Sequence, residues 1–180
     1  NKKISDNILL KNPYAFLKLE EEKKISNVCE SLILRIYALT GKFIRDPNIF
    51  AFGNFILCAL ANKPIEINSK NRVIRSYAYG SDIANLGLCW LLAKKRINDK
   101  LIFAASHTLS IHEMALRISK IYNLGDVISN IDYNLEANNY ICETNKFNNY
   151  LKFFQLEATD LNQQIKITYD YLKELNVKSF

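Results

Sequence analysis

The chain has 180 residues, enough for one domain or slightly more with a sizeable buried core. Its apolar content of 49% and charged content of 23% are ordinary for a globular protein, and its net charge of +6 is dispersed along the chain. The longest uncharged apolar run, residues 49–61, is too short to cross a bilayer, and no basic stripe carries interleaved aromatics, so we expect neither membrane nor nucleic-acid partners.

The first predicted element is a helix over residues 13–30. Asn12 is a favourable N-cap, and Pro13 suits the first helical position. Tyr14 and Lys18 lie four residues apart, so both side chains emerge on one face of this helix. A neighbouring ammonium favours the phenolate and lowers the pKa of a tyrosine from about 10. The pair therefore predicts a tyrosine that exchanges a proton with a sugar hydroxyl or a carbonyl.

A near-continuous apolar strand, residues 32–38, is predicted next, of the kind that is buried on both faces of a parallel sheet. It places Tyr14 and Lys18 in a helix–strand unit of an α/β layer. Tyr169 and Lys173 repeat the spacing near the C-terminus without a following strand. For a lone pair the alternative is an amphipathic helix with a lysine that extends toward solvent. Four apolar side chains of the first helix are expected to face the core: Phe16, Leu17, Ile25 and Val28.

Helices and short strands alternate along the rest of the chain, which predicts an α/β fold. Asp82 and Ser110 are expected to cap two of the helices. Residues 69–71 form a turn between two strands, and residues 127–145 are expected to be strand and loop. The helices are expected over residues 50–62, 83–95 and 111–122 and as a short and a longer helix within 148–175, and the strands over 64–68, 72–79 and 101–105.

Cysteine and histidine spacing predicts no metal site. His107 and His112 are five residues apart, so they do not share a helix face. No signal-peptide pattern is visible, and we expect a cytoplasmic chain with reduced thiols. The four cysteines are widely spaced and form no C-x-x-C motif: Cys29, Cys58, Cys89 and Cys142.

Five short motifs follow one another along the chain: Tyr14-x-x-x-Lys18, Arg35-Ile36-Tyr37-Ala38-Leu39-x-Gly41, Gly53-Asn54-Phe55-Ile56-x-x-Ala59-Leu60, Pro64-Ile65-Glu66-Ile67 and Arg75-Ser76-Tyr77-Ala78-Tyr79-x-x-Asp82. Their succession resembles the C-terminal half of the extended short-chain dehydrogenase/reductases, the NAD-dependent epimerase/dehydratase family acting on nucleotide sugars. The resemblance covers essentially the whole chain.

The resemblance implies an α/β fold with a partial Rossmann-like doubly wound sheet and a small α+β substrate-binding subdomain. Residues 1–40 would be the remaining edge of the Rossmann-like domain, and residues 41–180 would be mainly the substrate-binding region. The family's N-terminal βαβ unit has a glycine-rich turn that holds the dinucleotide pyrophosphate, and the five dispersed glycines of this chain form no such turn.

The resemblance also implies roles for individual residues. Tyr14 would be the general acid/base at the sugar hydroxyl, and Lys18 would lower its pKa and bind the nicotinamide ribose of NAD or NADP. Tyr37 would lie beside the nicotinamide. Asn54 and Arg75 would contact the diphosphate of the nucleotide sugar, for which a guanidinium fork is well suited.

Structural readings stand beside these roles. Arg75 can be an exposed strand residue, Asn54 only a helix cap and Tyr37 only a core residue. Arg35 lies in a strand that looks buried and is expected to pair with a carboxylate. Ala38 stands where the family usually has asparagine, which puts one substrate contact in doubt.

The expected function is therefore that of an NAD(P)-dependent epimerase, dehydratase or reductase acting on a nucleotide-linked hexose for deoxysugar or surface-polysaccharide synthesis. The family's catalytic Ser or Thr would lie before residue 1, so we expect a truncated form with little activity alone. Association as a homodimer or with a complementing half is expected, and the family's dimers commonly pack through the Tyr–Lys helix. The alternative is a non-catalytic protein that binds nucleotide sugars or other partners.

Overall fold

The structure, a computed structural model, describes residues 12–44, 46–94 and 97–178. Its helices are α2 (Pro13–Val28), α3 (Ala51–Leu60), α4 (Gly80–Leu92), α5 (Ile111–Tyr122), α6 (Asn145–Phe153) and α7 (Leu161–Lys178). Its strands are β1 (Ile33–Ile36), β2 (Ala38–Thr40), β3 (Glu66–Ile67), β4 (Val73–Tyr79), β5 (Leu101–Ala104), β6 (His107–Ser110), β7 (Ile128–Ser129) and β8 (Asn138–Tyr140). The predicted α/β class is confirmed.

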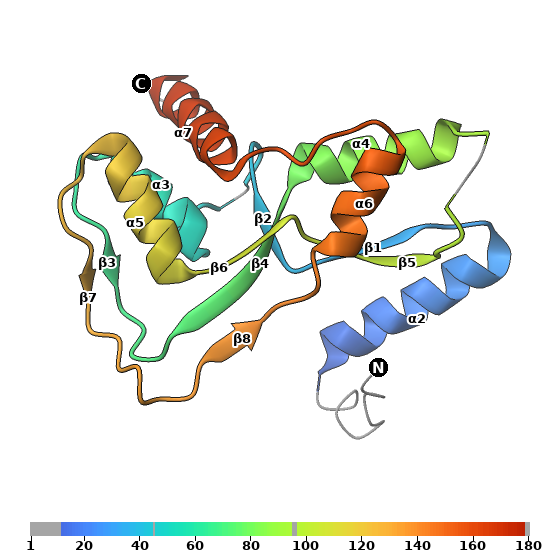
Figure 1. Cartoon of the computed structure of the whole chain (residues 1–180), viewed down its shortest axis with the longest axis horizontal. Helices are drawn as coiled ribbons and strands as arrows, with labels where there is room; N and C mark the ends of the chain where they lie inside the picture. Colours follow the sequence, from blue (N-terminus) through green and yellow to red (C-terminus); the bar gives the residue numbers. More distant parts are fainter. Residues whose placement is uncertain (1–11, 45, 95–96, 179–180) are drawn as a thin grey trace.

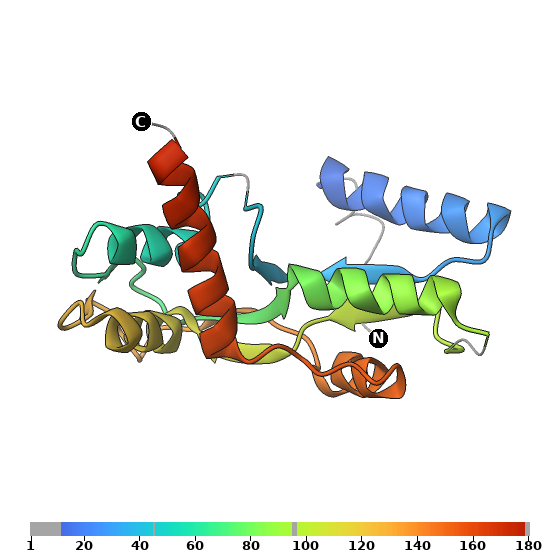
Figure 2. The ribbon, with the colours of Figure 1, turned by 90° about the horizontal axis from the view of Figure 1, so that it is seen from above.

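Strand β4 joins the two ends of the molecule (Figure 1). It pairs in parallel with β2 and β8 and antiparallel with β6. At one end of the molecule, β1 and β5 form a parallel pair with α2 and α6 on opposite faces (Figures 1 and 2). At the other end, α3, α5 and α7 gather beside the short parallel pair of β3 and β7.

Each end of the molecule has its own hydrophobic cluster. The larger cluster is built from one face each of α3, α5 and α7 and includes the fully buried Ile56, Met114 and Ile165. The smaller cluster includes Phe147 and Leu151 of α6. Full burial of a large apolar side chain contributes about 1.5–3 kcal/mol, so these clusters supply much of the driving force for folding.

Helix α5 begins as the sequence predicts. The Ser110 hydroxyl accepts from the Glu113 N–H (3.1 Å), and a Glu113 carboxylate oxygen accepts from the Ser110 N–H (2.7 Å). These reciprocal bonds form a capping box that satisfies otherwise unpaired groups at the helix start. The bonds from the Ser110 N–H and hydroxyl lower the pKa of the Glu113 carboxyl.

Helix α2 has the predicted bounds within two residues, but the expected inward face is wrong. None of its residues is buried, and the four side chains expected in the core are exposed: Phe16, Leu17, Ile25 and Val28. The helix is tied to β1 by a bidentate ion pair, in which Arg35 donates to both carboxylate oxygens of Glu22 (2.8 and 2.6 Å). Arg35 thus has the carboxylate partner that its strand position predicted.

Three further expectations are corrected. The strand over residues 32–38 is interrupted at Tyr37, where the chain passes from β1 to β2 and changes its pairing partner from β5 to β4. The turn over residues 69–71 does not join two paired strands, because β3 pairs with β7. Asp82 does not cap α4, because its buried carboxylate accepts from the N–H and hydroxyl of Thr159.

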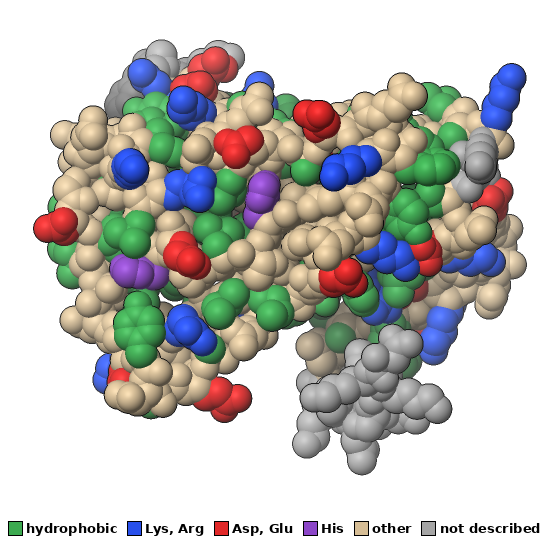
Figure 3. Space-filling view, viewed as in Figure 1, with side chains coloured by type: hydrophobic (Ala, Val, Ile, Leu, Met, Phe, Trp, Pro, Cys, Tyr) green, Lys and Arg blue, Asp and Glu red, His purple; other side chains and the backbone are tan. Residues whose placement is uncertain are grey.

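The dispersed charge is visible in the space-filling view, where basic and acidic side chains are interspersed over the face shown (Figure 3). Across the described ranges, no helix is both long enough and apolar enough to traverse a bilayer.

Candidate functional site

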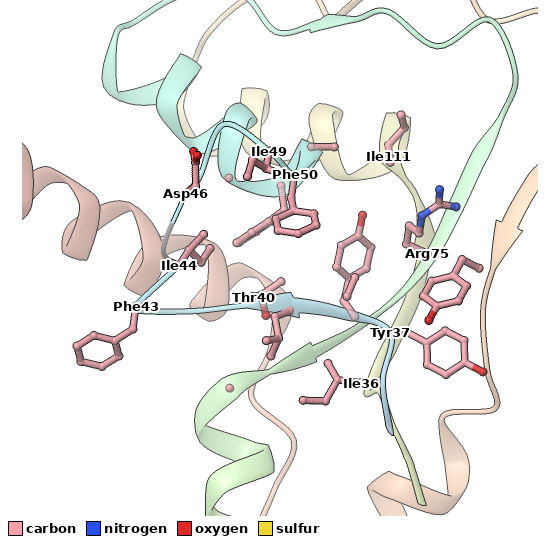
Figure 4. A pocket seen from close by; sticks show the side chains of 18 of the residues that line it. Ile36, Tyr37, Thr40, Phe43, Ile44, Asp46, Ile49, Phe50, Arg75 and Ile111 are labelled. Carbon is pink, nitrogen blue, oxygen red and sulfur yellow. The ribbon is translucent and has the colours of Figure 1, made fainter. Parts of the chain in front are cut away.

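A cavity of about 1340 Å³ lies where β2, β4, the loop over residues 41–44 and 46–50 and the start of α3 meet. Its wall is largely apolar and aromatic, and the charged side chains that line it are, among the described residues, Lys42, Asp46 and Arg75. Figure 4 shows the loop side chains Ile49 and Phe50 across from the β4 residue Arg75. A mostly apolar hollow with a few polar groups is typical of a small-molecule binding site.

Two glycines allow the chain to close around this cavity. Gly41 has a φ of 112°, and a Cβ there would lie 2.6 Å from a ring carbon of Tyr79. A Cβ on Gly53 would lie 2.4 Å from the carbonyl oxygen of Pro47. Both positions therefore require glycine, which supplies backbone freedom and close approach.

Tyr14 lines the cavity from the first turn of α2, where its side chain is 71% exposed. The Asn12 side chain caps this turn by accepting from the Ala15 N–H (3.1 Å), as predicted. The Lys18 Nζ lies 6.0 Å from the centroid of the Tyr14 ring, which places both predicted groups on one helix face. Lys18 itself is not among the cavity-lining residues.

Lys18 already has a charged partner. Its Nζ donates to a Glu21 carboxylate oxygen (2.8 Å), and this hydrogen bond raises the pKa of Lys18. The lysine is therefore firmly protonated at neutral pH. Its side chain is 54% exposed, which leaves it free to move toward a ligand.

Tyr37 and Arg75 lie together on another part of the cavity wall (Figure 4). The Tyr37 ring contacts the ring of Tyr140, with centroids 4.5 Å apart, and meets Phe103 edge-on at 5.9 Å. Burial raises the pKa of Tyr37, so its phenol remains neutral at physiological pH. Arg75 stands in register with Tyr140 across the β4–β8 pair.

The Arg75 guanidinium is anchored to backbone. Its Nη1 donates to the carbonyl oxygens of Ile74 (2.9 Å) and Asn138 (2.8 Å). A guanidinium carries five N–H donors in a fixed fork, so the anchored group still presents donors to an anion.

Asn54 is separated from this group. It lies in the first turn of α3, but it is not among the cavity-lining residues, and its side-chain oxygen faces the thiol of Cys58 at 4.0 Å. The structure thus brings Tyr14, Tyr37 and Arg75 to one cavity and leaves Asn54 and Lys18 outside its lining.

Two tyrosines that line the cavity were not predicted as site residues. Tyr140 lies in β8, within the segment over residues 127–145 that was expected to be strand and loop. Tyr77 was noted only as part of a motif, and it lines the cavity from β4 with burial raising its pKa to about 12. The alternation of β4, which places Tyr77 and Arg75 on the same face, was the available signal for Tyr77.

No protein-family model matches the sequence, and no match was found among curated proteins. Solved structures do resemble the fold. The UDP-glucuronic acid 4-epimerase from Bacillus cereus, in complex with UDP-glucuronic acid and NAD, superposes with a TM-score of 0.59 at 22% identity over 80% of this chain and 45% of its own.

Two further solved structures resemble this fold to a similar degree. The UDP-glucose 4-epimerase from Thermotoga maritima, with UDP-glucose, gives a TM-score of 0.60 at 16% identity over 81% of this chain and 46% of its own. The NAD-dependent NDP-hexosamine 5,6-dehydratase TunA gives 0.58 at 15% identity over 84% of this chain and 48% of its own. The chain therefore has the partial Rossmann-like fold of nucleotide-sugar epimerases and dehydratases, and it spans about half the length of these proteins.

Proposed function

We propose that the chain is the substrate-side part of an NAD(P)-dependent epimerase, dehydratase or reductase that acts on a nucleotide-linked hexose. The observation that carries this proposal is the convergence of Tyr14, Tyr37 and Arg75 on one cavity from α2, the β1–β2 junction and β4. The fold likeness supports it, since the solved structures are named as enzymes of this class.

In the proposed mechanism Arg75 binds the diphosphate through its planar fork, which its backbone anchors hold in one orientation. The nucleotide then fixes the hexose in the cavity, with one hydroxyl near Tyr14. Tyr14 takes or gives the proton at that hydroxyl, and the Lys18 ammonium stabilises the phenolate electrostatically once its side chain turns from Glu21.

NAD or NADP, when bound, would supply or accept the hydride. Tyr37, at the cavity wall, and the exposed Lys18 fit the nicotinamide and ribose side of such a cofactor. The pyrophosphate requires a glycine-rich turn that these 180 residues do not contain. Hydride transfer depends on a cofactor held in register, so we expect this chain alone to show little or no NAD-dependent turnover.

We further propose that the chain associates with a second copy or a complementing half. The exposed apolar residues of α2, among them Leu17, Ile25 and Val28, support this because such surface is normally covered in a folded assembly. Synthesis of deoxysugars or surface-polysaccharide precursors in the cytoplasm would be the setting.

The first experiment is a thermal-shift titration with UDP-, GDP-, CDP- and dTDP-hexoses, each with and without NAD. A ligand that binds only the folded state at a hundred times its Kd stabilises it by about 2.7 kcal/mol. We expect one nucleotide class to stabilise the chain and Arg75→Ala to abolish the effect. Arg72→Ala is the matched control, because Arg72 does not line the cavity. No shift with any nucleotide sugar would contradict the proposal for this chain.

A non-catalytic nucleotide-sugar-binding protein is the alternative, and the exposed position of Tyr14 favours keeping it in view. Tyr14→Phe separates the two functions in a preparation that turns over substrate. Loss of turnover with binding retained indicates chemistry at Tyr14, whereas retention of both indicates that Tyr14 has no catalytic role.

A further inference from the structure

The loop over residues 41–44 and 46–50 forms one wall of the cavity, yet its own contacts hold it only weakly. Phe43 is 79% exposed and Phe50 is 66% exposed. Within the described part of the loop, loop residues bond to one another from the Asn48 N–H to the Asp46 side chain (3.2 Å) and from the Ile49 N–H to the Asp46 carbonyl (3.3 Å). An exposed segment with few buried contacts opens easily unless something else fixes it.

Helix α7 supplies that support at the start of the loop. The Thr40 hydroxyl donates to the side-chain oxygen of Gln164 (2.5 Å), and the Gly41 N–H donates to the Thr168 hydroxyl (3.1 Å). Gln164 and Thr168 are fully buried and lie four residues apart, on one face of α7. One turn further, the Tyr171 ring contacts the Phe43 ring, with centroids 5.1 Å apart.

The other side of Gln164 is fixed as well. Its side-chain N–H donates to the carbonyl oxygen of Thr159 (2.6 Å), which also lies 3.1 Å from the His107 Nε2. Thr159 is held in turn by the buried Asp82 carboxylate, through its N–H (2.9 Å) and its hydroxyl (2.7 Å). A connected set of polar contacts therefore runs from α4 and β6 through Gln164 to the beginning of the cavity loop.

We propose that Gln164 and Thr168 are positioning residues that hold the cavity loop in its ligand-binding geometry without touching the ligand. Neither residue lines the cavity. Fully satisfied buried polar networks specify one arrangement, because each alternative leaves a buried group without a partner. The consequence for nucleotide-sugar affinity rests on the proposed function, whereas the hold of α7 on the loop does not.

The test compares hydrogen exchange in the loop with exchange in α5, which serves as an internal reference. Thr168→Val keeps the side-chain shape but removes the acceptor for the Gly41 N–H. We expect the loop amides of residues 41–44, 46 and 48–50 to exchange about five times faster while those of Ile111–Tyr122 are unchanged. Equal acceleration in both segments would indicate general destabilisation and overturn the proposal, and so would an unchanged loop.

A second variant, Gln164→Met, removes the acceptor for the Thr40 hydroxyl. Gln163→Met, on the exposed side of α7, is its matched control. Binding is measured well below the temperature of the unfolding midpoint, with a nucleotide sugar that stabilises the wild type. We expect Gln164→Met to weaken this binding about fivefold and Gln163→Met to have no effect on it. A loosened loop with unchanged affinity would overturn the positioning role. If the wild type binds no nucleotide sugar, the proposed function fails, while the exchange comparison still decides the role of α7.

Discussion

At the scale of single residues, Gly41 shows how one position shapes the cavity. Its positive φ and the nearby Tyr79 ring both exclude a side chain. We expect Gly41→Ala to lower the free energy of unfolding by more than about 1 kcal/mol, because it combines backbone strain with a steric clash. Chemical denaturation measures the change.

Gly87→Ala is the matched control for that substitution. Gly87 lies inside α4, and a Cβ there would meet no atom within 4 Å. Alanine is the better helix former by about 1 kcal/mol, so this variant should be more stable than the wild type. Equal effects of the two substitutions would refute the role given to Gly41.

Local chemistry allowed the sequence to predict residues that line the candidate cavity. Tyr14 could be placed from a helix start and a four-residue spacing, and Arg75 from an alternating strand; both line the cavity. Tyr140 could not be found in this way, since its place depends on the pairing of β8 with β4 across 63 residues, as in the Arg75–Asn138 hydrogen bond. The expectation for Asn54 named its helix correctly but not the direction of its side chain.

The contribution of the α5 capping box to stability should depend on pH. The bonds from Ser110 lower the pKa of Glu113, so the carboxylate contributes stability above the ordinary value near 4.3 and loses it as pH falls through its lowered folded-state pKa. We expect Glu113→Gln to cost about 0.5–1 kcal/mol at pH 7, after allowance for solvent screening, and progressively less as the pH falls toward 3.

Unfolding free energies of both proteins between pH 3 and 7 would check this. The exposed Glu157→Gln is the control for loss of one negative charge. A difference between Glu113→Gln and wild type that stays constant over the whole range would rule out the capping carboxylate as its source.

Helix α2 shows that apolar residues within a helix do not by themselves predict burial. Four of them were expected to face inward, but the side that packs on β1 includes Glu22, and these four side chains are exposed. We expect Glu22→Gln to weaken the half-buried bidentate pair with Arg35 by about 1 kcal/mol and to speed hydrogen exchange across α2 about fivefold. Glu20→Gln, which disturbs the exposed pair with Lys23, should leave exchange nearly unchanged. The same response to both variants would show that the Arg35 pair does not hold the helix.

At the scale of the whole molecule, the α/β class followed from the alternation of helices and strands, but the sheet order did not. The pairing of β1 with β5 joins residues 33–36 to residues 101–104, and no local pattern specifies such a partner. The same pairing leaves β1 half-exposed although its sequence is that of a strand buried on both faces. The proposed division at residue 40 remains a prediction.

Among the described residues, one edge of β1 has no strand beside it. The Ile33 N–H donates to the Lys100 carbonyl (2.8 Å), on the β5 side. Successive residues of a strand direct their backbone groups to opposite edges, so those of Ile36 face the edge that, among the described residues, has no strand beside it. Such an edge favours pairing with another chain.

We therefore expect the purified chain to self-associate with rising concentration, and Ile36→Pro to reduce this association at least fivefold. Proline removes the N–H at that edge but no bond to β5, and Ile36 is already 40% exposed, so the fold should be retained. Ile36→Ala keeps the N–H and serves as the control. Sedimentation equilibrium of the wild type and the two variants separates the causes. An equal loss of self-association in both variants would assign the association to the apolar side chain of Ile36. Unchanged self-association in both would exclude the β1 edge as the contact.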